Sequence, residues 1–213
     1  MGARDRILER IRRLQGRGGG GPSAAERLDM ESYLRAHPRG PLPAASPAQF
    51  EARVKANAGT TERVRDLAEV PGAAARYLGA LGLPLSGCCW PELSALDWRA
   101  AGLALEARAA RDADPVGVTG AFCAVAETGT LMLVSGAATP ASVSLVPETH
   151  VAVLSARRIV AHMEDAWDLL RAERRELPRA VNFVSGPSRT ADIEQTLILG
   201  AHGPYRVHVI IVG

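Results

Sequence analysis

Lysine and aromatic residues are scarce in this sequence. Lys55 is the single lysine among 25 basic residues, and only 4% of the 213 residues are aromatic. The arginine bias, together with a high content of alanine and glycine, indicates a GC-rich coding preference rather than a chemical requirement. The core must therefore be built mainly from Ala, Val, Leu and Ile. The length suits one medium domain, or one domain with a small appendage.

Cysteines are few, and long apolar runs are missing. An odd count that includes an adjacent pair (Cys88, Cys89 and Cys123) excludes a disulfide framework and suits a reducing compartment. No stretch approaches the roughly 18 consecutive apolar residues of a membrane span. The basic N-terminus is not followed by the apolar region of a signal peptide. We expect a cytoplasmic protein without a membrane span.

Motifs for metals and nucleotides are also missing. The sequence contains no Cys-x-x-Cys, no His-Glu-x-x-His and no Asp-rich loop. We therefore expect no metal and no iron–sulfur cluster in this chain. A phosphate-binding loop of the Walker type and a Gly-x-Gly-x-x-Gly turn are absent too, so a standard nucleotide site is not supported.

Positive charge is concentrated at the N-terminus. Six arginines and two acidic residues give residues 1–22 a charge of +4, whereas the whole chain has +2, which leaves −2 for the remainder. A nucleic-acid-binding protein carries its basic excess on the folded body, so nucleic acid is not an expected partner. Ile7, Ile11 and Leu14 predict a short amphipathic helix over 4–14.

The N-terminal 45 residues are expected to be separate from the folded domain. Glycines from Gly16 to Gly21 end the first helix, and four prolines lie between 37 and 48. This composition predicts a poorly ordered or extended connection over 16–46. We expect residues 1–45 to form a helix and its connection, and residues 46–213 to form one α/β domain.

Short apolar segments alternate with helical patterns after residue 46. Ser46-Pro47-Ala48-Gln49 has the form of a capping box with proline at the first helical position. Residues 100–113 fit either a strand or a helix. The alternation predicts an α/β fold with a mainly parallel sheet flanked by helices. Further helices are expected over 71–82, 162–171 and 188–199, and strands over 61–67, 83–89, 116–126, 130–134, 151–154, 181–184 and 207–212.

The loop after the predicted strand 181–184 is the first candidate site. A strand, a loop and a helix in this order place the loop at the carboxyl edge of a parallel sheet, where such domains bind ligands. Loop amides and a helix N-terminus would form an anion site, to which hydroxyl groups and a guanidinium add donors. An ordinary capped turn explains the same residues. The candidate ligand-binding residues are Gly186, Ser188, Arg189, Thr190 and Asp192.

Other candidates lie in a turn and in the histidines. Glu127, followed by Thr128, Gly129 and Thr130, could act as a base or nucleophile in a cleft. A hairpin turn with a solvated carboxylate is the alternative. His150 precedes a strand at the edge of the sheet, and His202 lies in a loop. His208, between two valines, is expected in the core, and Cys88-Cys89 are expected to serve strand packing.

Several segments in a fixed order resemble one known family. The chain is similar to the lactate utilization protein C family, whose members carry the LUD domain. The likeness is dense over about 115–213 and holds only by pattern over 46–114. The long Ser185–Glu194 segment is its most specific part. The other segments are Gly117–Ala121, Ala126–Leu131, Pro147 with His150-Val151, Gly200–Pro204 and Val207–Val209.

The resemblance implies a fold and a pathway. The fold would be Rossmann-like, similar to the group of sugar isomerases, CoA-transferases and formyltetrahydrofolate cyclo-ligase. The pathway would be oxidation of L-lactate to pyruvate beside two iron–sulfur partner subunits, with this chain as the cluster-free component. Phe122-Cys123 stands where the family pattern suggests an acidic residue, so a role for a carboxylate at that place is not expected.

Three hypotheses of function remain open. The first is a subunit that binds a small carboxylate or phosphorylated ligand at residues 185–194, opposite Glu127. The second is a stand-alone enzyme in which Glu127 acts as acid, base or acyl acceptor on a CoA ester, sugar phosphate or folate. The third is a non-catalytic assembly module that docks through residues 4–14.

Overall fold

The computed structural model describes residues 2–16, 21–36, 39–41, 45–174, 176–190, 198–200 and 202–213. The chain divides into two compact units, Met1–Gly40 and Pro41–Gly213. No helix in these ranges is long and apolar enough to cross a membrane.

The first unit contains two helices, α1 (Ala3–Leu14) and α2 (Ala24–Ala36). Helix α1 confirms the helix predicted over 4–14. Helix α2 lies inside the stretch predicted to be extended, so that prediction is wrong there. Its sequence signal is a capping box, in which Ser23 Oγ accepts from the amide of Glu26 and Glu26 Oε2 accepts from the amide of Ser23. The prediction of an extended connection rests on the flanking glycines and prolines and does not take this capping box into account.

A six-stranded parallel sheet forms the centre of the second unit, in the order β1-β12-β7-β4-β2-β3. The mainly parallel α/β fold predicted from the sequence is confirmed. Residues 100–113, which fitted either a strand or a helix, contain a strand. The six strands are β1 (Thr60–Val64), β2 (Ser86–Cys89), β3 (Ala104–Ala107), β4 (Val116–Gly120), β7 (Thr149–Ser155) and β12 (Arg206–Val212).

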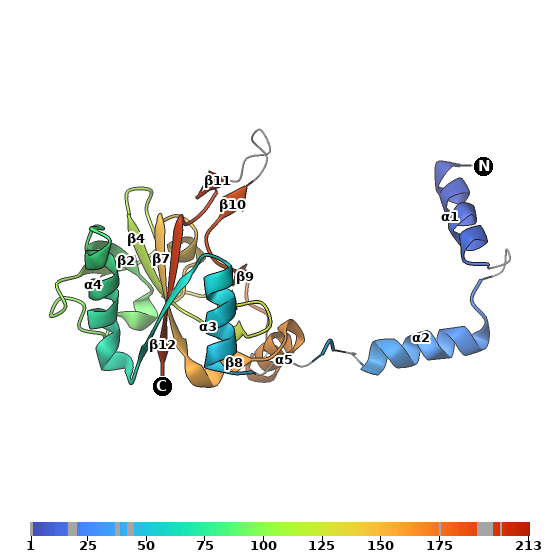
Figure 1. Cartoon of the computed structure of the whole chain (residues 1–213), viewed down its shortest axis with the longest axis horizontal. Helices are drawn as coiled ribbons and strands as arrows, with labels where there is room; N and C mark the ends of the chain where they lie inside the picture. The colour runs from blue at the N-terminus through green and yellow to red at the C-terminus, as the bar shows by residue number, and fades with distance from the viewer. Residues whose placement is uncertain are drawn as a thin grey trace. The chain divides into compact units, whose positions relative to one another are not determined.

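Two helices pack on this sheet, α3 (Pro47–Ala56) and α4 (Val70–Ala80) (Figure 1). Ser46 Oγ accepts a hydrogen bond of 3.2 Å from the amide of Gln49, which confirms the predicted helix start. Phe50 and Val54 bury the inner face of α3 in the core. Short 3₁₀ helices complete the connections: η1 (Leu67–Glu69), η2 (Pro91–Leu93), η3 (Ala141–Ser144) and η4 (Ala156–Arg158).

A second sheet has four strands in the order β8-β5-β6-β9. Strands β5, β6 and β9 are antiparallel neighbours, and β8 runs parallel to β5. Helix α5 (Met163–Glu173) packs on it through Ala166 and Leu170. The predicted strand 116–126 is thus divided between two sheets. The strands are β5 (Cys123–Val125), β6 (Thr130–Val134), β8 (Ile159–Val160) and β9 (Val181–Val184).

The helix predicted over 188–199 is wrong at both of its ends. Strands β10 (Arg189–Thr190) and β11 (Ile198–Leu199) form an antiparallel ribbon, and residues 191–197 lie outside the described residues. The Gly200 amide donates to the Ser188 carbonyl and continues the ribbon. Pairing between distant backbone segments here outweighs local helix propensity. Figure 1 shows the ribbon beyond the amino ends of β7 and β12, opposite the C-terminus.

Candidate functional site

The carboxyl edge of the parallel sheet contains a topological switch point, where the connections from two neighbouring strands lead in opposite directions. At the carboxyl edge the connection from β2 leads outward to β3, whereas the connection from β4 leads the other way to β7. Because β2 and β4 are neighbours, their connections diverge between them, and such switch points are where open α/β sheets bind ligands.

A cleft of about 260 Å³ opens at this switch point. Trp90 follows β2 directly, and Phe122 follows β4 after one residue, so two aromatic rings line the cleft where the strands end. The Trp90 indole Nε1 donates to the Pro140 carbonyl at 3.0 Å, which fixes the ring. The other lining residues are Glu92, Ala121, Val134, Thr139, Arg158, Glu173 and Arg174.

One arginine of the cleft is fully engaged in the protein itself. The guanidinium of Arg158 donates to both carboxylate oxygens of Glu173, and its Nε donates to the Phe122 carbonyl at 2.7 Å. It also lies 4.5 Å from the centre of the Phe122 ring, a cation–π distance. The hydrogen bonds from Arg158 hold the pKa of Glu173 below its usual range. This pair forms a wall of the cleft rather than a free charge.

Two charged side chains of the cleft, Glu92 and Arg174, are not bonded to other described residues. Both side chains are exposed, and neither makes a hydrogen bond or ion pair within the described residues. A carboxylate and a guanidinium that are not bonded to the protein remain able to contact a ligand. The cleft therefore combines apolar walls with two charged groups of opposite sign, an arrangement typical of small-molecule sites.

The predicted loop lies in a different place from the one expected. It follows β9, which belongs to the antiparallel sheet, so it does not leave a strand of the parallel sheet. A ribbon rather than a helix starts at Arg189. The expected strand–loop–helix anion site is therefore absent from the described residues, and the correction follows from the pairing of β9 with β6.

The structure brings this loop together with the turn 127–130. Thr128 Oγ1 lies 2.7 Å from Thr130 Oγ1, which lies 2.6 Å from Ser185 Oγ, so three hydroxyl groups form a chain. Asn57, at the end of α3, joins both segments. Its side-chain amide donates to the Thr128 carbonyl at 2.8 Å, and its carbonyl accepts from Arg189 Nη2 at 2.7 Å.

Two glycines allow this close approach. Gly129 has φ +68°, and a Cβ there would lie 2.7 Å from backbone atoms of Arg53 and Val54. Gly186 has φ +76°, and its Cβ would lie 2.3 Å from the Asn57 carbonyl oxygen. Arg189 places its charge on the carbonyl at the C-terminus of α3, where the helix dipole favours a cation. The contacts of this cluster hold α3 against the turn and the loop.

The other predicted site residues are dispersed. His150 is fully buried inside the sheet, where its Nε2 lies 2.8 Å from Thr119 Oγ1, and burial lowers its pKa to about 4. His202 is exposed. The amide of Ser188 donates to a backbone carbonyl, and Thr190 is buried. Asp192 lies outside the described residues.

Glu127 and the cysteines have contrasting environments. The Glu127 side chain is partly exposed and makes no hydrogen bond within the described residues, so its catalytic role stays a prediction. The three cysteines are buried, and desolvation raises the pKa of Cys88 to about 12 and of Cys123 to about 11. Such thiols are unreactive, and the packing role expected for Cys88-Cys89 is confirmed. His208 lies in the core as predicted, bonded to Thr60.

Sequence reasoning missed most of the cleft. Asn57 carried no motif, and Arg158, Glu173 and Arg174 meet Trp90 only through the fold. One signal was available, because Trp90-Pro91-Glu92 follows a predicted strand directly. Charged and aromatic residues at the end of a parallel strand are the usual ligand contacts of such sheets.

Fold and cleft define an α/β protein with a Rossmann-like parallel sheet and a cleft at its switch point. The family model of the LUD domain matches residues 92–212, more than half of the chain. The chain therefore belongs to the LUD-domain family, as the sequence resemblance predicted.

Related proteins and one solved structure agree with this assignment. The chain is 41% identical over 100 residues to Lactate utilization protein C of Halalkalibacterium halodurans, over 46% of this chain and 44% of that protein. Identity to the protein of the same name in Bacillus subtilis is 39% over 100 residues, 46% of this chain and 42% of that one. These matches span less than half the length of either relative.

The fold has a counterpart among solved structures. A crystal structure of a DUF162 family protein from Deinococcus radiodurans matches with a TM-score of 0.61 and 28% identity, over 78% of this chain and 95% of that one.

Proposed function

We propose that this protein is a component of an L-lactate utilization system, in which L-lactate is oxidised to pyruvate together with iron–sulfur partner subunits. The observation that carries the proposal is the identity of 41% over 100 residues to a protein named Lactate utilization protein C. The cluster-ligand motifs missing from the sequence are consistent with partners that carry the redox centres.

Within that system, the chain binds a small carboxylate in the carboxyl-edge cleft. A cleft of about 260 Å³ suits a ligand of a few heavy atoms rather than a drug-sized molecule. Arg174 offers the guanidinium, since Arg158 is already bonded to Glu173. Trp90 and Phe122 cover the apolar part of the ligand. Arginine binds carboxylates through paired donors, which supports this orientation.

Deleting the gene in its own host tests the pathway. We expect loss of growth on L-lactate as sole carbon source, normal growth on pyruvate, and recovery when the gene is restored. Unchanged growth on L-lactate would contradict the proposal. Affinity purification of the tagged chain from lactate-grown cells should recover two iron–sulfur proteins. If these two proteins are not recovered, the proposed partners are wrong, whereas the proposed pathway is unaffected.

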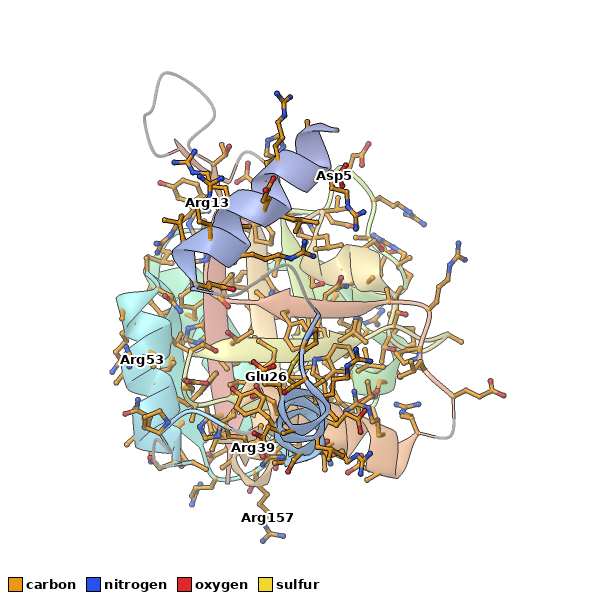
Figure 2. All side chains as sticks on the ribbon, turned by 90° about the vertical axis from the view of Figure 1, so that its right-hand side faces the viewer. Asp5, Arg13, Glu26, Arg39, Arg53 and Arg157 are labelled. Carbon is orange, nitrogen blue, oxygen red and sulfur yellow. The ribbon has the colours of Figure 1, made fainter. Side chains whose placement is uncertain are left out.

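Titration of the purified chain tests the cleft. Pyruvate and L-lactate should change the tryptophan fluorescence of the chain, to which Trp90 in the cleft contributes, and Arg174→Ala should weaken binding. Arg157→Ala is the matched control, because Arg157 projects from the body and has no interaction within the described residues (Figure 2). If both variants bind like the wild type, the cleft assignment is wrong.

The predicted loop site is tested by charge reversal. If residues 185–190 bind the anion instead, Arg189→Glu abolishes binding while Arg174→Ala does not. This outcome would place the anion site in the loop after Val184, as the sequence predicts.

A further inference from the structure

Helix α1 has one apolar face with no buried residue among those that the structure describes. Ile7, Ile11 and Leu14 are 60%, 45% and 79% exposed, and Leu8 is partly exposed. With about 100° between successive residues of a helix, Ile7, Ile11 and Leu14 lie within roughly 60° of one another, and Leu8 lies about 60° beyond Ile11. These four side chains form one apolar stripe, about 120° wide, along the helix.

The charges of α1 are ordered around this stripe. Arg4 and Arg10, three residues before and after Ile7, lie about 60° to either side of it. Asp5 and Glu9, two residues before and after Ile7, lie about 160° away. Arg4 therefore lies between Ile11 and Leu8, whereas Arg10 and Arg12 border the apolar stripe on its two sides, about 40° beyond Leu14 and Leu8. Both carboxylates lie at least about 120° from the middle of the stripe.

The ends of α1 are stabilised locally. Asp5 Oδ2 accepts a hydrogen bond of 3.1 Å from the amide of Gly2, and Arg12 and Arg13 lie in the last turn, where the helix dipole favours cations. Figure 2 shows Asp5 and Arg13 towards opposite ends of the helix. A helix of 12 residues is nevertheless marginal alone in water, so a surface that covers the stripe would stabilise it.

Helix α2 provides a contrast within the same unit. Leu28, Met30, Tyr33 and Leu34 are exposed there, but Leu28 points away from the other three. Three acidic residues against two arginines give α2 a charge of −1, whereas five arginines against two acidic residues give α1 +3. The ordered pattern of apolar and basic residues therefore belongs to α1 specifically.

We propose that α1 is an interfacial helix that binds an anionic phospholipid surface. Ile7, Leu8, Ile11 and Leu14 enter the boundary between headgroups and acyl chains, and Arg10 and Arg12 contact lipid phosphates. A planar surface presents phosphates at equal depth on both sides of the helix, which matches arginines placed about 40° beyond either border of the stripe. Interfacial helices have this distribution, with a strongly polar opposite face.

Four aliphatic side chains and two bordering arginines give weak, reversible and salt-sensitive binding. A basic residue close to an anionic membrane contributes about 1 kcal/mol, which corresponds to about fivefold in affinity. The contribution falls with distance on the scale of the Debye length, about 10 Å, which is similar to the helix diameter. Arginines that border the stripe should therefore matter more than an arginine on the far side.

Sedimentation of the full chain with lipid vesicles tests the proposal. We expect binding to vesicles of phosphatidylglycerol mixed with phosphatidylcholine, no binding to phosphatidylcholine alone, and loss of binding at high salt. Arg10→Gln should weaken binding about fivefold. Arg13→Gln removes the same charge from the far side, about 100° from Leu14, the nearest residue of the stripe, and should change binding less than about twofold.

Ile11→Ser separates insertion from electrostatic attraction, because it keeps every charge and should still weaken binding. Equal effects of Arg10→Gln and Arg13→Gln, or no effect of Ile11→Ser, would overturn the proposal and indicate diffuse charge attraction. Absence of vesicle binding would also overturn it. In that case protection of α1 from hydrogen exchange in the free chain identifies the body as its partner, and protection only with an added protein identifies that protein.

Discussion

The amino and carboxyl edges of the parallel sheet use polar residues in opposite ways. At the amino edge, Asn57, Thr128, Thr130, Ser185 and Arg189 bond to one another across three segments. At the carboxyl edge, the cleft keeps charged groups that bond to nothing in the described residues. Residues that satisfy one another stabilise a fold, whereas residues left unsatisfied remain available to a ligand.

This difference separates two meanings of a family motif. Ser185–Arg189 belongs to the segment that carries the sequence resemblance, and in the structure it holds the end of α3 against the turn 127–130. The groups proposed to bind the ligand lie in short segments with no recognisable pattern. A segment can therefore stand out in the sequence because the packing of several elements depends on it.

The largest expected effect is at Gly186. Alanine there meets the Asn57 carbonyl and must also keep φ +76°. The left-handed backbone costs about 1–2 kcal/mol and the steric overlap about 1–3 kcal/mol, so we expect a loss of about 2–5 kcal/mol in unfolding free energy. Urea denaturation measures it. Gly82→Ala is the control, because Gly82 has φ +62° with nothing within 4 Å of a Cβ. Equal losses in the two variants would show that the contact with α3 does not matter.

The second largest effect is expected from acid, through two buried histidines near the amino edge of the sheet. Burial lowers the pKa of His150 and of His208 from 6.5 to about 4. Between pH 6.5 and 4 the unfolded chain binds protons that the native chain excludes, so stability falls as pH falls through this window. The slope of unfolding free energy is about 1.4 kcal/mol per pH unit for each histidine, and about 2.7 kcal/mol per pH unit for both together.

Substitution of one histidine measures its share of this slope. His150→Gln should lower the slope of unfolding free energy between pH 6.5 and 5 by about half, whatever it does to stability at pH 7. An unaltered slope in His150→Gln would mean that burial does not lower the pKa of this imidazole.

The parallel sheet was predictable because its strands are local and strongly apolar. Val116–Gly120 and Arg206–Val212 are almost entirely buried, and short buried runs between helices are typical of parallel strands. The capped start of α3 was predictable for the same reason, since Ser46 and Gln49 are neighbours in the sequence.

The second sheet and the cleft were not predictable, because they depend on distant pairs. Val181–Val184 is a short apolar run that fits either sheet, and only its pairing with β6 assigns it. Arg158 meets Phe122 across 36 residues, a contact that no local pattern encodes. The placement of Ser185–Arg189 failed through the same ambiguity, although the segment does contact the turn 127–130 through Ser185 and Thr130.

A moderate effect is expected at Arg189. Arg189→Ala removes a hydrogen bond of 2.7 Å to the last turn of α3, together with a favourable charge at its C-terminus. We expect a loss of about 0.5–1.5 kcal/mol in unfolding free energy and no change in ligand affinity. Arg157→Ala should stay within about 0.5 kcal/mol of the wild type. Unchanged stability with weakened ligand binding would reverse the roles assigned to the two edges.

The smallest effect on stability is expected in the cleft, together with a characteristic effect on binding. Arg174→Gln and Glu92→Gln remove exposed charges that bond to nothing in the described residues, so each should change unfolding free energy by less than about 0.5 kcal/mol. A carboxylate ligand is attracted by Arg174 and repelled by Glu92. Arg174→Gln should therefore weaken pyruvate binding and Glu92→Gln should strengthen it, each by about fivefold at low salt.

Calorimetric titration at low and high salt measures both changes. Screening by salt should reduce them together, because both are electrostatic. Two shifts in the same direction would exclude a ligand anion lying between these side chains. Opposite shifts with unchanged stability would show that the carboxyl edge binds the anion through charged groups that the fold does not need.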